Sequence, residues 1–216
     1  MRLVSVNVGM PRLLTRLGRT VKTGIGKSPV SGRVQVSRTG IEGDGQADLD
    51  SHGGVDMAVH GYPFEHYAYW QRELAREEEM SPGQFGENLT VEGATERDLR
   101  IGDVVRVGSA LLEVSQPRIP CVKLAMRMEL AAFPKMFLAS GKVGFYFRVL
   151  EEGEIGAGDT IEWERRPDDS MTVREVAGLV TFEPHQAETV RRAAGLAALS
   201  LEWRERFTSA LAKIDG

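Results

Sequence analysis

The feature that most constrains this chain is an alternation of apolar and polar residues through its first two-thirds, interrupted at short intervals by glycine. Alternation with a period of two places every second side chain on the same face of a β-strand. Glycine makes up 24 of the 216 residues, which provides many positions for tight turns between short strands. The pattern therefore predicts a mainly β fold, with its clearest strands at residues 3–8, 33–37, 104–107, 111–115, 144–150 and 160–163.

Helical periodicity is limited to a few segments. One helix is predicted over residues 64–75, and a second helical stretch, over residues 122–138, is divided by Pro134. The sequence lacks the regular alternation of strands and helices that would indicate a parallel sheet. Short strands around a few short helices favour a closed or nearly closed β-barrel instead.

The chain divides at a charged segment that contains proline. Residues 164–171 form a predicted linker between a β-barrel domain at 1–163 and a helical module at 172–216. Three short helices are expected in this module, and the first should start with a capping box formed by Thr172 and Glu175. The module contains six basic and six acidic residues, which argues against a DNA-reading surface. We expect it to dock a partner or to cover a pocket.

Charge and hydropathy exclude several classes of protein. The 27 Lys and Arg residues are outnumbered by 31 Asp and Glu residues, so the net charge of −4 argues against nucleic-acid binding. No apolar run approaches the length of a transmembrane helix, and the first residues alternate too soon for a signal peptide. With a single cysteine in addition, we expect a cytoplasmic protein without a membrane or nucleic-acid partner.

Two common cofactor signatures are absent from the sequence. No GxGxxG motif indicates a dinucleotide site, and four thiolates for an iron–sulfur cluster are not available. The segment Gly26-Lys27-Ser28 does not complete a P-loop, because the position of its first glycine is Val21. Residues 23–28 are left as a glycine-rich turn whose amides and lysine could bind an anion, or as a flexible exposed loop.

The only cysteine, Cys121, lies in the segment QPRIPCVKL at residues 116–124. Prolines on its N-terminal side, including Pro120, stiffen the bend that presents the thiol. Arg118 and Lys123 flank it, and a predicted helix begins next, so the surroundings favour the thiolate over the thiol. A thiolate could be a nucleophile or a metal ligand. The alternative is a small buried side chain with a structural role only.

Residues 40–60 contain the densest group of Asp and His side chains. Three of them, His52, Asp56 and His60, are spaced four apart and would share one face of a helix, as in a zinc or manganese hydrolase. The two glycines after His52 make a continuous helix costly. The alternative is a loop of Asx turns, with His60 leading into the next helix.

Five segments, in this order, resemble the MOSC domain family, and more closely its YiiM-like branch, the hydroxylaminopurine-resistance proteins. They are GIEGDGQAD at 40–48, HGGVD at 52–56, FGENL at 85–89, IGD at 101–103 and QPRIPCVKL at 116–124. The resemblance covers residues 1–163, and residues 172–216 resemble the three-helix module of that branch. It implies a MOSC-type β-barrel that binds molybdenum cofactor, with Cys121 as the protein ligand to molybdenum. Members of the family reduce N-hydroxylated compounds to amines.

The resemblance also indicates which residues could bind the cofactor. Thiolate is a soft ligand that suits molybdenum, and the pterin dithiolene supplies further sulfur atoms. The phosphate of the cofactor requires cationic partners. The candidate cofactor-binding residues are Lys27, Ser28, Arg38, Asn88, Arg118, Pro120, Cys121 and Lys123, with Arg148 as an alternative to Arg38.

The implied reaction needs protons and electrons. His52 and His60 are the candidate catalytic proton donors beside Cys121, because an unperturbed histidine titrates near pH 6.5, at about the working pH. An external flavin or iron–sulfur reductase is expected to supply the electrons, since the chain carries no redox motif of its own. The alternative function is a non-catalytic carrier of molybdenum cofactor.

Overall fold

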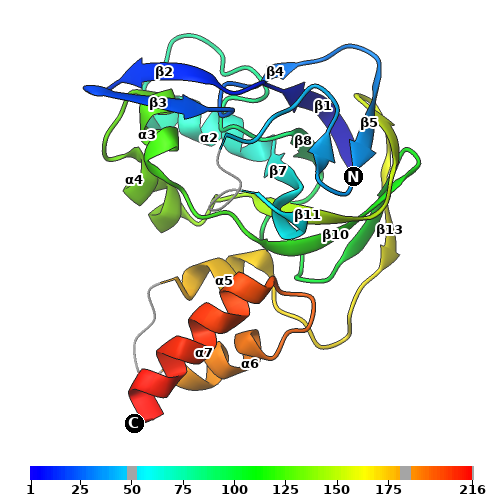
Figure 1. The fold of residues 1–216 in the computed structure, drawn as a ribbon, viewed down its shortest axis with the longest axis vertical. Helices are drawn as coiled ribbons and strands as arrows, with labels where there is room; N and C mark the ends of the chain where they lie inside the picture. The colour runs from blue at the N-terminus through cyan, green and yellow to red at the C-terminus, as the bar shows by residue number, and fades with distance from the viewer. Residues whose placement is uncertain (48–52, 181–185, 216) are drawn as a thin grey trace.

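The computed structural model describes residues 1–47, 53–180 and 186–215 (Figure 1). Eight strands form the main sheet, in the order β13-β9-β10-β11-β7-β8-β1-β4. Its neighbouring strands are antiparallel except for β7 and β8, which run parallel. The strands are β1 Arg2–Val8, β2 Arg12–Arg16, β3 Arg19–Thr23, β4 Ser28–Pro29, β5 Arg33–Ser37, β6 Gly40–Ile41, β7 Val59–Pro63, β8 Leu89–Glu92, β9 Val104–Val107, β10 Ala110–Pro117, β11 Phe145–Glu151, β12 Gly153–Gly156 and β13 Ile161–Arg165.

The prediction of a mainly β fold is confirmed, but no continuous strand ladder closes the main sheet into a barrel within the described ranges. Strand β13 lies at one edge, and the chain just before it reaches β1 near the other edge through a single bridge between Arg2 and Thr160. Backbone bonds from Leu3 N to Asp159 O (2.9 Å) and from Ile161 N to Met1 O (2.9 Å) support that approach. Two smaller sheets, β12-β5-β6 and the β2–β3 hairpin, complete the strand structure.

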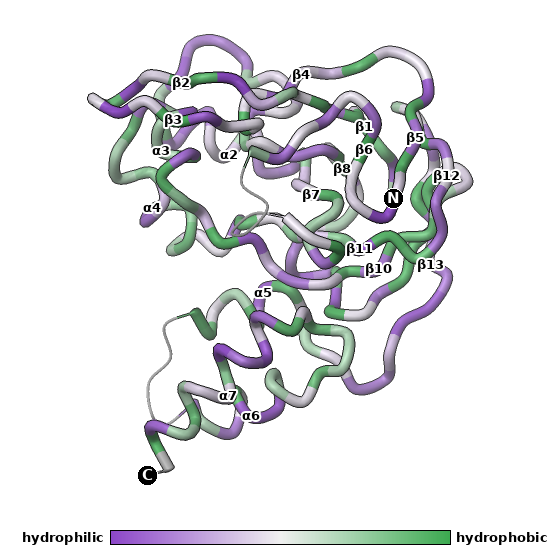
Figure 2. The backbone as a smooth tube through the Cα atoms, in the orientation of Figure 1, coloured by the Kyte–Doolittle hydropathy of each residue, from purple (hydrophilic) through white to green (hydrophobic). Residues whose placement is uncertain are grey.

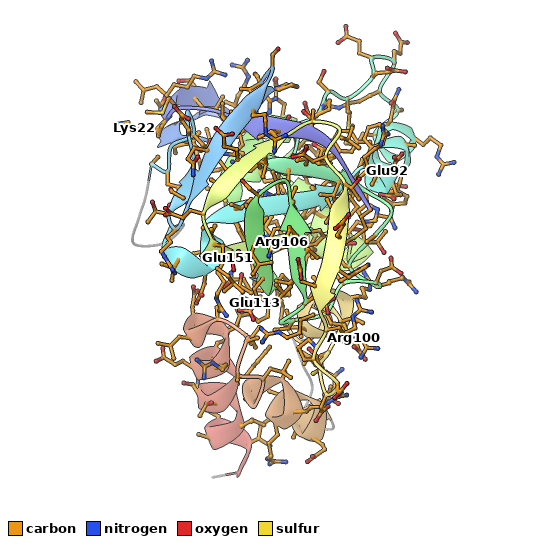
Figure 3. All side chains as sticks on the ribbon, turned by 90° about the vertical axis from the view of Figure 1, so that its right-hand side faces the viewer. Lys22, Glu92, Arg100, Arg106, Glu113 and Glu151 are labelled. Carbon is orange, nitrogen blue, oxygen red and sulfur yellow. The ribbon has the colours of Figure 1, made fainter. Side chains whose placement is uncertain are left out.

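The outer face of the main sheet is polar, as the alternation predicts. Figure 3 shows Arg106 on this face beside Glu151, to which its guanidinium lies 3.3 Å away, and the same group pairs with Glu164 at 2.5 Å. The inner face carries buried apolar residues, and parts of strands β10 and β11 are hydrophobic (Figure 2). Alternation did not predict strand β7. All five of its residues are buried, so the strand has no solvent-facing side that would require alternating polar residues.

The predicted helices of the first part are confirmed, with shifted ends. Pro134 does not break a helix. It lies in the first turn of the second helix, where the backbone N–H that proline lacks would not form a hydrogen bond within the helix. The first of the two helices ends at Met128, and its C-cap residue, Glu129, adopts a left-handed conformation with φ 55°. The helices are η1 Val55–Met57, α2 Glu65–Glu73, α3 Val122–Met128, α4 Phe133–Ser140, α5 Val173–Gly178, α6 Ala187–Ala194 and α7 Leu201–Asp215.

Helices α5, α6 and α7 lie together at one end of the molecule, next to β10 (Figure 1). Trp203 and Phe207 of α7 are buried in the same apolar cluster as the inner residues of the main sheet. The sheet and the C-terminal helices therefore share one core, and the division into domains at residues 164–171 stays a prediction. None of the described helices combines the length and the apolar composition needed to span a lipid bilayer.

The predicted capping box at the start of α5 is confirmed. Thr172 Oγ1 accepts a hydrogen bond from Glu175 N at 3.1 Å, and Thr172 N donates to Glu175 Oε2 at 2.7 Å. Replacement Thr172→Ala removes the acceptor, so we expect the free energy of unfolding to fall by about 1 kcal/mol. Urea denaturation measures this change. Thr208→Ala, at an exposed position of α7, is the control and should change it by less than about 0.5 kcal/mol.

Candidate functional site

A cavity, which we call the main cavity, opens where the loop after β3, the loop after β6, strands β7 and β11, and the bend after β10 meet. Most of the residues proposed from the sequence as cofactor ligands line it, although they come from distant parts of the chain. They are Lys27, Asn88, Arg118, Cys121 and Lys123. The cavity is also lined by His60, which was proposed as a proton donor, and by Asp44 and Tyr146, which were not selected from the sequence.

Cys121 occupies the N-cap position of α3, with an extended backbone (φ −127°, ψ 177°). Its carbonyl accepts the hydrogen bond from Leu124 N at 3.0 Å, so the thiol side chain is carried on the first turn of the helix. The residue is half-buried and lines the main cavity. A thiol at the wall of a cavity is accessible to a ligand, unlike the fully buried structural cysteine considered as the alternative.

Arg118 is a buried cation that faces the main cavity. It is 6% exposed, its Nη1 donates to Phe85 O at 2.9 Å, and its guanidinium lies 5.5 Å from the ring centre of Phe137. No carboxylate forms an ion pair with it among the described residues. A buried charge without a counterion is costly, so this position favours an anionic ligand.

Lys27 and Asn88 meet at the carboxylate of Asp44. Lys27 Nζ lies 2.5 Å from Asp44 Oδ1, and Asn88 Nδ2 donates to Asp44 Oδ2 at 2.8 Å. Burial lowers the pKa of Lys27, while the charge and the hydrogen bond of Asp44 raise it and partly offset that effect. The ion pair between Lys27 and Asp44 therefore places the lysine ammonium group at the cavity wall, where the Asp44 carboxylate balances its charge.

Residues 23–28 are not a flexible exposed loop. Thr23, Ile25 and Lys27 are buried, and a Cβ atom at Gly24 would lie 2.2 Å from Gly45 O. Only glycine at position 24 allows the two backbone segments to touch. The glycine-rich turn is therefore a packed wall of the main cavity, and the anion-binding alternative of the sequence analysis agrees with this position.

The structure changes the expected role of His60. The residue lies on strand β7, not at the entry to a helix, and only 3% of its surface is exposed. Burial, followed by the nearby charge of Arg118, lowers the pKa of His60 well below 6.5. The imidazole is neutral at physiological pH, so the expectation of a proton donor with an ordinary pKa is wrong. Its Nε2 atom has no hydrogen-bond partner among the described residues.

Tyr146 on β11 is a candidate proton donor that the sequence analysis missed. Its ring centre lies 5.0 Å from that of His60, and it lines the main cavity. Burial raises the pKa of Tyr146, so the phenol is protonated at neutral pH and can donate a hydrogen bond. The segment 144–150 was interpreted only as a strand. Its alternation puts Tyr146 on a face opposite the buried Phe145 and Phe147, which is the signal that could have indicated it.

Two residues proposed as cofactor ligands lie away from the main cavity. Ser28 is exposed on β4 and pairs with Val8, so its side chain does not belong to the wall formed by its neighbour Lys27. Arg38 is exposed in the turn after β5, where its backbone N donates to Glu152 Oε1 at 2.8 Å. Both were chosen from nearness in sequence or from charge, and neither property determines which way a side chain points.

The remaining sequence candidates have other positions. Pro120 lines a neighbouring cavity, not the main one. Arg148 forms ion pairs with Asp56 and with Glu113, both at 2.7 Å, so its charge is already neutralised. His52 lies outside the described residues.

The hydrolase interpretation finds no support in the parts of the chain that the structure describes. The segment around Asp56 is a single turn, η1, followed directly by strand β7, so Asp56 and His60 do not share a helix face. Asp56 pairs with Arg148. Within residues 1–47, 53–180 and 186–215, no three His, Cys, Asp or Glu side chains are grouped to hold a metal ion.

Comparison with known proteins identifies relatives over most of the chain. Residues 48–162 match the MOSC domain. The protein YiiM of Escherichia coli is 38% identical over 83% of this chain and 80% of that protein. A protein of Gibberella moniliformis named "Reductase" is 37% identical over 76% of this chain, but the match covers 29% of that protein. The crystal structure of YiiM from Geobacillus stearothermophilus superposes with a TM-score of 0.82, at 38% identity, covering 97% of this chain and 98% of that one.

The lowered pKa of His60 predicts a pH dependence of stability. Because the unfolded chain binds a proton below about pH 6.5 and buried His60 does not, the free energy of unfolding falls as the pH drops through that value. Between about pH 7.5 and pH 5.5 this effect amounts to about 1.4 kcal/mol. In His60→Gln that part of the loss should disappear, as measured by urea denaturation at each pH. An equal loss in wild type and variant would contradict the assignment.

Proposed function

Because the chain belongs to the MOSC domain family, we propose that it binds molybdenum cofactor and reduces N-hydroxylated compounds, namely hydroxylaminopurines, hydroxylamines and amidoximes, to amines. One observation carries the proposal: the same cavity is lined by a half-exposed thiol and by a buried arginine that has no carboxylate partner within the described part of the chain. The name of the fungal relative, "Reductase", agrees with an oxidoreductase. That name describes a protein of which this chain matches less than a third.

The groups of the main cavity fit the chemistry of this cofactor. Cys121 would provide the soft thiolate ligand for molybdenum. Arg118, Lys27 and Lys123 would bind the phosphate and the polar pterin, with Asn88 offering amide donor and acceptor atoms. When bound, the cofactor supplies a metal that changes its oxidation state by two electrons.

The proposed reaction balances as R–NH–OH + 2 e⁻ + 2 H⁺ → R–NH₂ + H₂O. The N–O bond breaks, one N–H bond and one O–H bond form, and both electrons come from a separate flavin or iron–sulfur reductase protein. Tyr146, protonated at neutral pH, would donate a hydrogen bond to the leaving oxygen. Neutral His60 would line the site without adding positive charge.

The first test concerns the metal ligand. Cys121→Ser replaces a soft sulfur donor by a hard oxygen donor of similar size, so protein produced in a host that makes the cofactor should contain little or no molybdenum. Elemental analysis of wild type and variant measures this. A wild-type protein that retains molybdenum but never reduces a hydroxylamine with an artificial electron donor would favour the carrier function. Equal molybdenum content in both proteins would disprove the role of Cys121.

The second test separates cavity cations from other surface charges. Arg118→Gln removes charge-assisted hydrogen bonds to the cofactor, each worth about 1.5–3 kcal/mol, so we expect the dissociation constant of the cofactor to rise roughly 10- to 150-fold. Release of the cofactor during dialysis, followed by its absorbance, measures the change. Arg38→Gln is the matched control, since Arg38 lies outside the cavity, and should bind like the wild type. Equal weakening by both substitutions would point to a general effect of net charge.

A further inference from the structure

The first part of the chain has a charge opposite to that of the whole. Residues 1–41 contain eight Lys and Arg side chains and no Asp or Glu, although the net charge of the chain is −4. Half of these cations lie on the β2–β3 hairpin, namely Arg12, Arg16, Arg19 and Lys22. The hairpin forms a two-stranded sheet of its own. It is therefore a small basic surface on a protein that is acidic as a whole.

Most of this charge is not neutralised within the molecule. Arg16 pairs with Glu129, with Nε 3.2 Å from Oε1. Among the residues that the structure describes, no carboxylate pairs with Arg12, Arg19 or Lys22. Arg19 and Lys22 are exposed, and Lys22 lies at the outer edge of the molecule (Figure 3). Exposed cations without counterions favour the approach of a negatively charged partner.

The hairpin also exposes large apolar side chains. Leu13 is 73% exposed and lies beside Lys22, its partner on the other strand. Met10, just before β2, and Leu17, at the turn, are exposed as well. Single exposed apolar residues are common, but three within eight positions form a patch. Apolar side chains surrounded by charged ones are typical of the interfaces between proteins.

The turn of the hairpin is strained, and the strain places a leucine at its tip. Arg16 and Arg19 pair across a two-residue turn, in which Leu17 and Gly18 have φ values of 52° and 70°. Such turns favour Asn-Gly or Gly-Gly, because a bulky side chain is disfavoured at positive φ. Leu17 is 45% exposed, so packing within the protein offsets little of this strain. A partner that covers Leu17 would give the strained leucine a function.

The hairpin lies against the helix that begins at Cys121. Figure 1 shows β2 and β3 over α3, at the end of the molecule opposite α5, α6 and α7. Leu14 of β2 packs against the apolar cluster to which α3 contributes. Helix α3 has seven residues and is about 10 Å long, so the ion pair of Arg16 with Glu129 lies about one short helix from Cys121. Residues 23–25, which follow directly, line the main cavity.

We propose that the β2–β3 hairpin is the docking surface for an acidic electron-donor protein of the flavodoxin or [2Fe–2S] ferredoxin type. This inference rests on the reductase function proposed above, which takes its electrons from a separate protein. Each donor molecule is oxidised by one electron, so two encounters supply the two electrons that, with two protons, convert one N–OH group to an amine and water. Acidic side chains of the donor would face Arg19 and Lys22, and its apolar side chains would cover Leu13 and Leu17.

A protein partner suits this surface better than a lipid bilayer or a nucleic acid. Both of these carry negative charge over distances much longer than the hairpin, so the net charge of −4 on the whole chain opposes their approach. A small acidic protein needs to cover little more than the hairpin itself, because weak redox complexes bury less than about 1,200 Å².

The experiment measures electron transfer from the donor. Cofactor-loaded protein and 6-hydroxylaminopurine are mixed with pre-reduced flavodoxin or [2Fe–2S] ferredoxin, and reoxidation of the donor is followed by stopped-flow absorbance. In the double variant Arg19→Glu, Lys22→Glu we expect the second-order rate constant at low ionic strength to fall at least about 10-fold, because the attraction of the donor is lost. Added salt should lower the rate constant of the wild type and not that of the variant.

Two controls separate docking from other effects of charge. The double variant Arg97→Glu, Lys213→Glu changes the net charge by the same amount at exposed positions in the turn after β8 and on α7. Its rate constant should stay within about 2-fold of the wild type, because the reversed charges lie away from the hairpin. With reduced methyl viologen, a small donor that needs no docking surface, both double variants should reduce the substrate as fast as the wild type.

The variant Leu17→Asn distinguishes an interface residue from a structural one. Asparagine is favoured at positive φ, so the urea concentration at the midpoint of unfolding should not fall. Loss of the leucine from the interface should nevertheless lower the rate constant with the protein donors about 5-fold.

The outcomes distinguish this inference from the function beneath it. A wild-type protein that reduces 6-hydroxylaminopurine with none of the donors disproves the reductase function. Activity with methyl viologen but with neither protein donor, or equal rate constants in the wild type and the Arg19→Glu, Lys22→Glu variant, overturns the docking surface. Unchanged electron transfer, with sedimentation on vesicles of equal parts phosphatidylglycerol and phosphatidylcholine that this variant loses, would assign the hairpin to a lipid surface instead.

Discussion

The carboxylate of Asp44 connects the chain segments that form the main cavity. It accepts hydrogen bonds from Lys27 Nζ at 2.5 Å, from Asn88 Nδ2 at 2.8 Å and from Gly9 N at 2.9 Å. These donors belong to the loop before β4, the turn before β8 and the end of β1. A buried carboxylate is stable only when its oxygens are paired, so each of the three segments is held in place by the requirement to satisfy this one group.

A second buried carboxylate, Glu87, performs the same task for the turn before β8. Its oxygens accept from Gly83 N (2.8 Å), Phe85 N (3.1 Å), Thr90 Oγ1 (2.9 Å) and the hydroxyl of Tyr67. Burial raises the pKa of Glu87, and the hydrogen bonds from Tyr67, Gly83 and Thr90 partly counteract that effect. These hydrogen bonds hold the turn before β8 in place. The turn contains Asn88 and also Phe85, whose carbonyl accepts the hydrogen bond from Arg118. Because Asp44 and Glu87 are hydrogen-bonded to other groups, neither carboxylate neutralises Arg118, and its charge stays available for a ligand.

Local patterns predicted those parts of the protein whose structure depends on neighbouring residues. Six strands were found by the alternation of apolar and polar residues, whereas β7, all of whose residues are buried, was not. The bend at residues 116–124 placed Arg118, Cys121 and Lys123 at one cavity because these residues are close in sequence. The same reasoning failed for Ser28, whose side chain points away from the wall that Lys27 forms. Tyr146 escaped notice because a tyrosine within a strand resembles any other half-buried aromatic residue.

The sequence by itself determined the class of the fold, the capping box at Thr172 and the single thiol at a stiff, cationic bend, since each follows from short-range sterics and hydrogen bonding. Only the tertiary structure decided the electrostatics of the site. Burial, which depends on segments far apart in the chain, lowered the pKa of His60 and left Arg118 without a carboxylate partner among the residues that the structure describes. It also brought α7 against the end of β10, where Gln116 and Trp203 line one cavity although they are 87 positions apart in the chain. Desolvation and long-range packing have no local sequence signature.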